Sequence, residues 1–460
     1  MSKKSARVQP SLDDLRRTNE RPGDLLAARP LLVGTRCGVV KDLRAVPRDV
    51  TEPAEPHVYR AQLANHRFVH DSADDLVASG KGVTHAAAVV SALGEAVERY
   101  SSACWGGEDV VYGARSEVDG DALDPRDLVL YRPEQYADVE YAPYRDETEL
   151  GWVPARSLVS GGELFVPALA VSMAHHVHSP GEYLFRPTSN GLATGSTLSR
   201  AILAAALEVI ERDAFVVAWS NRLPCDLADP KSHPDAAVRR LYHAYLRRGV
   251  ALSLHRLPSD HPIHVFLALA IDRAVDDAPA AVVGLGADFD AARAATKAAL
   301  EVGQVRPSLR MRLREPETRR RLQELVADPH AVAELEDHDL LYAAPELLHA
   351  FDFLHRDSLA TLSRPEPREP EPEVDQLGRL VEHLRTAGQD LLYVNLTSPD
   401  MGGLGLHTVR VLIPCFQPID FGWKEQRLGG ERLFELPVRL GFTSVPTAPE
   451  TLNSFPHPLA

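Results

Sequence analysis

Alanine-rich helical segments alternate along this chain with short apolar runs of strand length. Residues 86–100 and 201–219 have apolar positions on nearly every side of the predicted helix, which is typical of a helix enclosed by the fold. A third helix is predicted over residues 291–305. Short apolar runs predict strands at residues 110–112, 128–131, 151–153, 164–171, 252–257 and 265–271. The alternation predicts an α+β (mixed α/β) fold in which helices pack on β-sheets.

The N-terminal part of the chain has a different pattern. Residues 1 to about 25 are polar, and two short strands around a turn are predicted at residues 29–34 and 38–40. We therefore expect residues 1–56 to form an N-terminal arm that precedes the main part of the fold.

Proline and charge interrupt the pattern again near residues 363–375. Repeated proline removes backbone donors and the charges favour water, so this stretch is predicted to be a surface linker. A helix at residues 376–387 and a strand at 390–396 follow it, so one main domain is expected over residues 57–445. The last segment, residues 446–460, contains several prolines and is predicted to be a C-terminal tail.

Two of the predicted helices carry a pair of glutamates three residues apart, and an arginine follows each pair. The pairs are Glu95 with Glu98, and Glu208 with Glu211. Residues three apart are neighbours on a helix surface, so each pair places two carboxylates on one face. The likeness of the two segments, each preceded by a glycine-rich stretch, also hints at an internal duplication.

Two interpretations of these pairs are open. A lone pair of glutamates on a helix is usually a solvated face. Here the two helices contain few other charged residues, so both faces are expected to be enclosed. Enclosed carboxylates cost several kcal/mol each unless cations or protons compensate them. Magnesium shared with nucleotide phosphate oxygens meets this requirement, so a nucleotide site is the leading hypothesis.

The third helix supports the same hypothesis. The glycine-rich residues 284–287 precede it, and Glu301 with Gln304 repeats the spacing of three. Arg306 and Arg310 follow. A helix face with side-chain oxygens and nearby cations suits a polyphosphate and its metal ions.

Composition excludes some classes of function. The chain has 460 residues, and 50 basic against 65 acidic residues give a net charge of -15, which argues against binding to a nucleic-acid backbone. No uncharged apolar run reaches the roughly 18 residues of a membrane span. We expect a cytoplasmic protein without a nucleic-acid or membrane partner. The four cysteines stand singly, without a zinc or redox motif, and are expected to be reduced and mostly buried.

With these motifs assembled, the chain resembles the YcaO family, and within it the stand-alone cyclodehydratase subunits that form azolines in ribosomally synthesised peptides. The likeness covers about residues 57–460. The most specific motifs lie at residues 80–101 and 189–213, where a glycine-rich segment leads into a glutamate pair. Residues 337–342 and 395–400 are supporting matches. The resemblance implies a YcaO-type ATP-binding fold.

The resemblance also implies the ligands of ATP and Mg²⁺. The expected metal ligands are Glu95, Glu98, Glu208 and Glu211. The expected nucleotide contacts are Lys81, Ser91, Ser189, Asn190, Glu301, Gln304 and Arg310. For the lysine, a solvated loop position remains the alternative.

The family reaction uses a Cys, Ser or Thr side chain of a substrate peptide to attack the preceding amide carbonyl. The resulting oxyanion takes the γ-phosphoryl group of ATP, and phosphate leaves as the thiazoline or oxazoline ring closes. Proton transfer needs a general base, which the spacing of residues does not identify.

The end of the chain bears on that missing base. Family cyclodehydratases end in alternating prolines, PxPxP, which are thought to place the terminal carboxylate in the active site. Here Pro456 and Pro458 keep the alternation, and Ala460 occupies the third proline position. We expect the carboxylate of Ala460 to act in the site. A loose tail is the alternative interpretation.

The resemblance implies partners as well. A separate ThiF-like or winged-helix protein is expected to bind the leader of the precursor peptide, and a flavin-dependent dehydrogenase can follow in such pathways. An oligomeric assembly is also expected. Two other functions remain open: formation of a thioamide or amidine on the same activated amide, and a non-catalytic nucleotide-binding scaffold. The sequence does not identify the precursor or the residue type that is cyclised.

Overall fold

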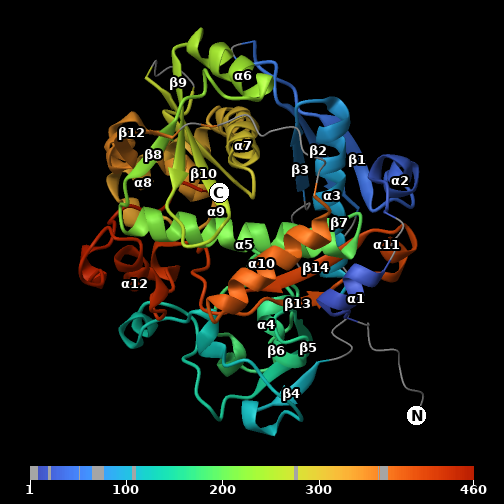
Figure 1. Cartoon of the computed structure of the whole chain (residues 1–460). Helices are drawn as coiled ribbons and strands as arrows, with labels where there is room; N and C mark the ends of the chain where they lie inside the picture. Colours follow the sequence, from blue (N-terminus) through green and yellow to red (C-terminus); the bar gives the residue numbers. More distant parts are fainter. Residues whose placement is uncertain are drawn as a thin grey trace.

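The computed structural model of the chain describes residues 9–18, 22–50, 52–64, 77–105, 110–273, 278–360, 362 and 371–459. Three β-sheets with helices packed on them form the molecule (Figure 1). The predicted α+β fold is therefore confirmed. Within the described ranges, every helix is too short or too polar to cross a membrane.

The three-stranded sheet is antiparallel and has the order β1-β2-β3. Its strands are β1 (Val40–Ala45), β2 (His57–Leu63) and β3 (Val77–Gly82). The five-stranded sheet has the order β11-β10-β9-β8-β12, and its strands β8 and β12 are parallel. Its strands are β8 (Cys225–Ala228), β9 (Val250–Leu257), β10 (His264–Asp272), β11 (Ala281–Asp288) and β12 (His355–Ala360).

The six-stranded sheet has the order β4-β5-β13-β14-β7, with a sixth strand, β6, paired to β5. Its strands are β4 (Val111–Gly113), β5 (Leu150–Ser157), β6 (Glu163–Pro167), β7 (Leu192–Gly195), β13 (Leu392–Asn395) and β14 (His407–Leu412). All of its pairings are antiparallel.

Helices cover the sheets and join them. The α-helices are α1 (Leu12–Arg17), α2 (Leu25–Leu32), α3 (His85–Ala103), α4 (Ala168–Val171), α5 (Leu198–Ser220), α6 (Ala236–Leu246), α7 (Ala291–Arg312), α8 (Pro316–Ala327), α9 (Leu335–Leu341), α10 (Glu373–Thr386), α11 (Pro399–Gly403) and α12 (Arg432–Arg439). Figure 1 shows α5 crossing the middle of the molecule, with the five-stranded sheet on one side and the six-stranded sheet on the other. The predicted enclosure of this helix is confirmed by its many buried residues.

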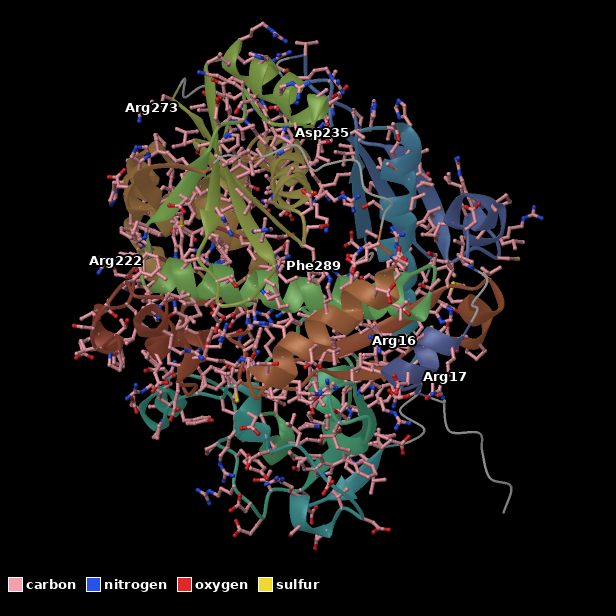
Figure 2. The ribbon with its side chains drawn as sticks, viewed as in Figure 1. Arg16, Arg17, Arg222, Asp235, Arg273 and Phe289 are labelled. Carbon is pink, nitrogen blue, oxygen red and sulfur yellow. The ribbon has the colours of Figure 1, made fainter. Side chains whose placement is uncertain are left out.

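Each of the helices α3, α5 and α7 directly follows a strand, and a polar side chain starts each one. Thr84 accepts a hydrogen bond from a backbone N–H in the first turn of α3, and Thr197 and Asp290 do the same for α5 and α7. Phe289, in the turn between β11 and α7 (Figure 2), lies under the guanidinium of Arg379, which is 4.4 Å from the ring centre. The turn before α7 is thereby packed against α10.

Glycines let two of these helices lie close to their strands. A Cβ atom on Gly80 of β3 would lie 2.0 Å from the backbone nitrogen of Ala92 in α3. A Cβ atom on Gly286 of β11 would lie 2.2 Å from the carbonyl oxygen of Ala294 in α7. Any other residue would push the helix away from the sheet.

Two of the predicted strand segments were wrong, and a third was predicted too long. Residues 29–34 belong mainly to helix α2, because Asp24 caps that helix by accepting hydrogen bonds from two backbone N–H groups. Residues 128–131 do not form a strand, since Val129 has a φ angle of 57°. The predicted strand 164–171 ends at Pro167, where helix α4 begins.

The prediction that most of the cysteines are buried was wrong as well, whereas the prediction that they are reduced agrees with the structure. Of the four cysteines, Cys225 is buried and Cys104 is half-buried, whereas Cys37 and Cys415 are exposed. All four are free thiols.

The predicted N-terminal arm shares a sheet with the predicted main domain. The boundary after residue 56 falls between β1 and β2, which pair in one sheet. Residues 363–370 of the predicted linker and Ala460 lie outside the described residues. The C-terminal segment 456–459 is buried, which does not fit a loose tail.

Candidate functional site

A cavity of about 750 Å³ lies where helices α3, α5 and α7 meet. The loop before β7 forms another part of its wall. Most of the residues singled out from the sequence line this cavity: Lys81, Ser91, Glu95, Glu98, Ser189, Asn190, Glu208, Glu301 and Gln304. The fold therefore gathers three separated motifs around one space.

Helices α3 and α7 present their first carboxylates in the same way. Glu95 accepts a hydrogen bond through Oε2 from the backbone N–H of Ser79, at 3.1 Å. Glu301 accepts through Oε2 from the backbone N–H of Leu285, at 2.8 Å. Both donors stand 16 residues before their acceptor, on the strand that precedes the helix. The closer repetition in the structure therefore relates α3 to α7, rather than α3 to α5.

Side chains of β3 and α7 connect across the cavity wall. The Nζ atom of Lys81 lies 3.6 Å from Oε1 of Glu301. Gln304 donates from Nε2 to the hydroxyl oxygen of Ser79, at 3.0 Å. Lys81 is thus a strand residue facing an acid of the site, and not a solvated loop lysine.

Two arginines lie among the acids. The guanidinium of Arg99 is 3.5 Å from Oε1 of Glu95 and 3.8 Å from Oε1 of Glu98. Arg212 lies 3.0 Å from Oε1 of Glu211. Burial opposes the charge of both arginines, but the neighbouring glutamates raise their pKa values above the ordinary one. Both remain cations able to contact phosphate.

The carboxylates are short of positive charge. Burial raises the pKa of Glu98 well above its ordinary value, and Glu208 and Glu95 add to the rise while Arg99 opposes it. Burial also raises the pKa of Glu208. Burial, helped by Glu301 and Glu208, raises the pKa of Glu211 to about 7. An added cation would favour the ionised forms of all three. This donor set of carboxylate oxygens fits Mg²⁺.

Arg410 is a buried cation behind the cavity that the sequence reasoning missed. It donates from Nε to the carbonyl of Val171 at 3.1 Å and from Nη2 to the carbonyl of Thr188 at 2.8 Å, and Nη1 bonds the carbonyl of Asn190. Burial lowers its pKa to about 10, and Glu208 opposes this effect. The available signal was an arginine in the middle of the apolar strand β14.

The loop fixed in this way contains a buried polar group without a partner, on a residue that lines the cavity. The side-chain oxygen Oδ1 of Asn190 is buried and has no hydrogen-bond partner among the described residues. Asn190 also lines the cavity. A buried acceptor without a donor is costly, so a bound donor would relieve it. This observation fits a nucleotide in the cavity.

Two predicted residues lie away from the cavity lining. Glu211 does not line it, although Glu301 and Glu208 are near enough to help raise its pKa. Arg310 is 3.4 Å from Oε1 of Glu52, which also binds Arg306. The structure therefore places Arg310 in an ion-pair group with the N-terminal arm.

The C-terminal segment enters the site. Leu459 lines the cavity. Trp219 of α5 donates from Nε1 to the carbonyl of Phe455 at 2.9 Å, and the hydroxyl of Tyr342 donates to the carbonyl of Pro456. His338 contacts the carbonyl of His457 at 2.7 Å. These contacts direct the end of the chain toward the acids.

Three buried groups near this segment resemble a metal site but are poorly arranged for one. Ligand atoms of His338, Asp420 and His457 lie within 4.8 Å of one another. The two imidazole rings stack, with centres 4.0 Å apart and planes 16° apart, so their lone pairs lie in nearly parallel planes. In addition, Nε2 of His457 donates to the carbonyl of Asp420 at 2.7 Å. We assign this cluster to holding the C-terminal segment.

Comparison with known proteins agrees with this geometry. The family described as YcaO cyclodehydratase, ATP- and Mg²⁺-binding, matches residues 79–417. The chain belongs to the YcaO family. The matched range lies within the main domain predicted from the sequence and contains all three helices of the site. This YcaO domain binds ATP and Mg²⁺, as the resemblance implied.

Two relatives match over much of the YcaO domain. An uncharacterized protein of Methanothermobacter thermautotrophicus is 30% identical over 365 residues, which are 78% of this chain and 87% of the relative. An uncharacterized protein in the tfuA 3' region of Rhizobium leguminosarum bv. trifolii is 29% identical over 245 residues, which are 50% of this chain and 54% of the relative.

Solved structures have the same YcaO fold. A heterocyclase in complex with substrate and cofactor superimposes with a TM-score of 0.76 and 25% identity, over 96% of this chain. This chain spans only 59% of that heterocyclase. YcaO from Methanopyrus kandleri, bound with AMPPCP and Mg²⁺, has a TM-score of 0.62 and 19% identity, over 87% of this chain and 92% of that one.

Proposed function

We propose that the chain is an ATP-dependent cyclodehydratase that converts Cys, Ser or Thr residues of a precursor peptide to thiazolines or oxazolines. Phosphorylation of the backbone amide oxygen would turn a poor leaving group into phosphate. The observation that carries this proposal is the position of Leu459, which lines the same cavity as the glutamate pairs. The last described residues of the chain are thereby held beside the acids.

The acids of the cavity are proposed to hold the metal ions. Glu95, Glu98 and Glu208 line the cavity, and Glu211 lies next to Arg212 behind it. Mg²⁺, when bound, neutralises the phosphate charge and so favours phosphoryl transfer. Before binding, burial raises the pKa values of Glu98, Glu208 and Glu211, and the neighbouring arginines offset this rise only in part. The site is therefore suited to release protons as the metal enters.

Other residues are proposed to bind and orient the nucleotide. Arg99 and Arg212 offer planar guanidinium groups to phosphate oxygens. Asn190 offers its unsatisfied Oδ1 to a donor group of the nucleotide. Lys81, which lines the cavity 3.6 Å from Glu301, supplies a further positive charge. Ser91 and Ser189 offer hydroxyl groups at the cavity lining.

The carboxylate of Ala460 is proposed to accept a proton during ring closure. The attacking thiol or hydroxyl and the amide nitrogen must each lose a proton. A carboxylate at the end of a clamped segment can reach such a proton without a change of fold. The clamp by Trp219, Tyr342 and His338 supports this role.

A separate leader-binding protein, ThiF-like or winged-helix, is proposed to deliver the precursor. The heterocyclase of known structure is much longer than this chain, which spans 59% of it. The E. coli microcin synthetase McbBCD, whose matched chain has the same fold, is described as a complex with pro-MccB17 bound, which supports a partner for this chain.

The deciding experiment follows the peptide mass and phosphate together. The chain, the proteins encoded beside it, a candidate precursor and Mg-ATP are incubated, and each ring is expected to remove the mass of one water while releasing one phosphate. The control is the same chain with Glu98→Gln, which should release no substrate-dependent phosphate. Phosphate release without a change in peptide mass would contradict cyclodehydration. Absence of both with every partner present would favour the non-catalytic scaffold.

Formation of a thioamide or amidine is the second candidate. The charged lining of the cavity serves the activation of the amide, and an external sulfide or amine could use that activated amide equally well. One relative is described by its position in the tfuA 3' region, so the product of a neighbouring gene is a partner to include in the assay. A product in which sulfur replaces oxygen would identify thioamide formation.

A further inference from the structure

A second cleft lies next to the nucleotide cavity. It has a volume of about 550 Å³. One wall comes from the segment between β4 and β5, and the other walls come from the loops before α9 and after β14. Its tyrosines and charged lining residues are Tyr141, Tyr183, Asp138, Glu140, Glu334, Glu425, Arg186 and Lys424.

Three chain segments run from this cleft directly into the cavity. Glu334 lines the cleft and its neighbour Leu335 lines the cavity. Gly422 lines the cleft, and Phe421 lines the cavity. The segment from Arg186 to Ser189 makes the same connection on a third side. At two points, therefore, consecutive residues of the chain line the cleft and the cavity, so the two lie close to each other.

Aromatic rings give the cleft a firm apolar wall. The rings of Tyr141 and Tyr183 meet edge to face, with centres 5.1 Å apart, and Tyr131 stacks behind Tyr141 at 5.2 Å. The hydroxyl of Tyr141 donates to Oε1 of Glu425 at 2.8 Å. Rings held in this way can contact a peptide without losing much side-chain entropy.

The rim of the cleft is acidic. The guanidinium of Arg186 forms ion pairs with Oε2 of Glu334, at 2.8 Å, and with Oε1 of Glu425, at 3.8 Å. Asp138 and Glu140 are exposed and have no ion-pair partner among the described residues. Lys424 also lines the cleft, so its lining has four acids and two cations. This surplus of negative charge repels the phosphates of a nucleotide and attracts a basic ligand.

We propose that this cleft binds the stretch of substrate peptide beside the reacting residue, in an extended form and with basic side chains facing Asp138 and Glu140. The proposal rests on the proposed function, because the reacting amide must reach the phosphate in the neighbouring cavity. The acids and rings of the cleft then favour substrates that carry lysine or arginine near the modified position. Tyr183 and Tyr141 contact the peptide between those positions.

The test uses a fluorescein-labelled synthetic dodecapeptide with two lysines flanking a central Gly-Cys pair. Its affinity is measured by fluorescence anisotropy at low salt for the full chain and two variants. Glu140→Lys is expected to weaken binding about fivefold, the effect of one rim charge pair. Glu147→Lys changes the same charge at an exposed position that does not line the cleft, and should leave the affinity unchanged.

A charge exchange makes the test specific. A second peptide with glutamates in place of the two lysines should bind the unaltered chain more weakly, and should regain affinity for the Glu140→Lys variant. The affinity for Mg-ATP should be the same in all three proteins. Equal effects of Glu140→Lys and Glu147→Lys, or no recovery with the acidic peptide, would overturn the proposal. Recovery without any change of peptide mass in the turnover assay would support the cleft and reject the cyclodehydratase function.

Discussion

His338 donates a hydrogen bond from Nδ1 to the backbone carbonyl of His457, at 2.7 Å, and the two rings stack. The carbonyl can only accept, so the proton of His338 is on Nδ1. Burial lowers the pKa of His338 to about 4, which keeps it neutral near pH 7. Together with Tyr342, which donates to the carbonyl of Pro456, it fixes the segment that ends in the cavity.

Removing one of these contacts should loosen the end of the chain. Tyr342→Phe leaves the buried carbonyl of Pro456 without its donor, at a cost of about 1–3 kcal/mol. We expect the backbone amide of Leu459 to exchange its hydrogen roughly tenfold faster, as measured by mass spectrometry of the C-terminal peptide. Turnover should fall while the affinity for Mg-ATP stays the same.

The control for this variant is Tyr112→Phe, at an exposed position of β4. It removes the same hydroxyl without touching the C-terminal segment. If both variants exchange at the rate of the unaltered chain, the clamp does not hold the terminus.

The charge of Glu208 should matter for binding of Mg-ATP. Glu208→Gln keeps the shape but removes a carboxylate from the cavity, and we expect the affinity for Mg-ATP to fall at least about tenfold. This affinity is measured by calorimetric titration of the protein with ATP at a fixed Mg²⁺ concentration. Glu382→Gln, at an exposed position of α10, is the matched control. Unchanged affinity in Glu208→Gln would remove this residue from the set of proposed ligands.

The stability of the metal-free chain should depend on pH through Glu211. Its pKa of about 7 in the folded chain lies above the ordinary value of 4.5. The stabilisation from its protonated form is therefore complete below pH 4.5 and is lost as the pH rises through 7. Relative to Glu211→Gln, which cannot titrate, the unaltered chain should lose roughly 2 kcal/mol of unfolding free energy between pH 5 and pH 8.

Urea denaturation of both proteins at the two pH values measures this difference. Comparing the two proteins cancels the titration of other groups. Saturating Mg-ATP should reverse the order at pH 8, because a cation favours the ionised carboxylate. If the difference in unfolding free energy between the two proteins is the same at pH 5 and at pH 8, Glu211 does not titrate in this range.

Local sequence patterns predicted much of this site, for a physical reason. The glutamate pairs stand at helical spacing in helices with few other charges, so both the helices and their faces follow from residues near one another in the chain. The glycine-rich strands before them are equally local. Residues 29–34 show the limit of such local prediction. They were predicted as a strand, but they belong mainly to helix α2, whose first turn is capped by Asp24.

The parts that sequence reasoning missed depend on distant contacts. Arg410 bonds carbonyls more than 200 residues away in the chain, such as that of Thr188. Arg310 was expected at the nucleotide, but Glu52 of the N-terminal arm lies beside it. The clamp on the C-terminal segment joins α5 and α9 to residues far along the chain. No local spacing reveals such pairs.

Glycine at position 80 should be essential for the position of α3. In Gly80→Ala the new Cβ would lie 2.0 Å from the backbone nitrogen of Ala92, so helix and strand must separate, at a cost of about 3 kcal/mol. Ser79, the next residue, anchors Glu95, so the affinity for Mg-ATP should fall together with the melting temperature. Gly403→Ala is the control, since a Cβ there meets open space. A Gly80→Ala protein that melts and binds Mg-ATP like the control would show that this close approach does not position the glutamate.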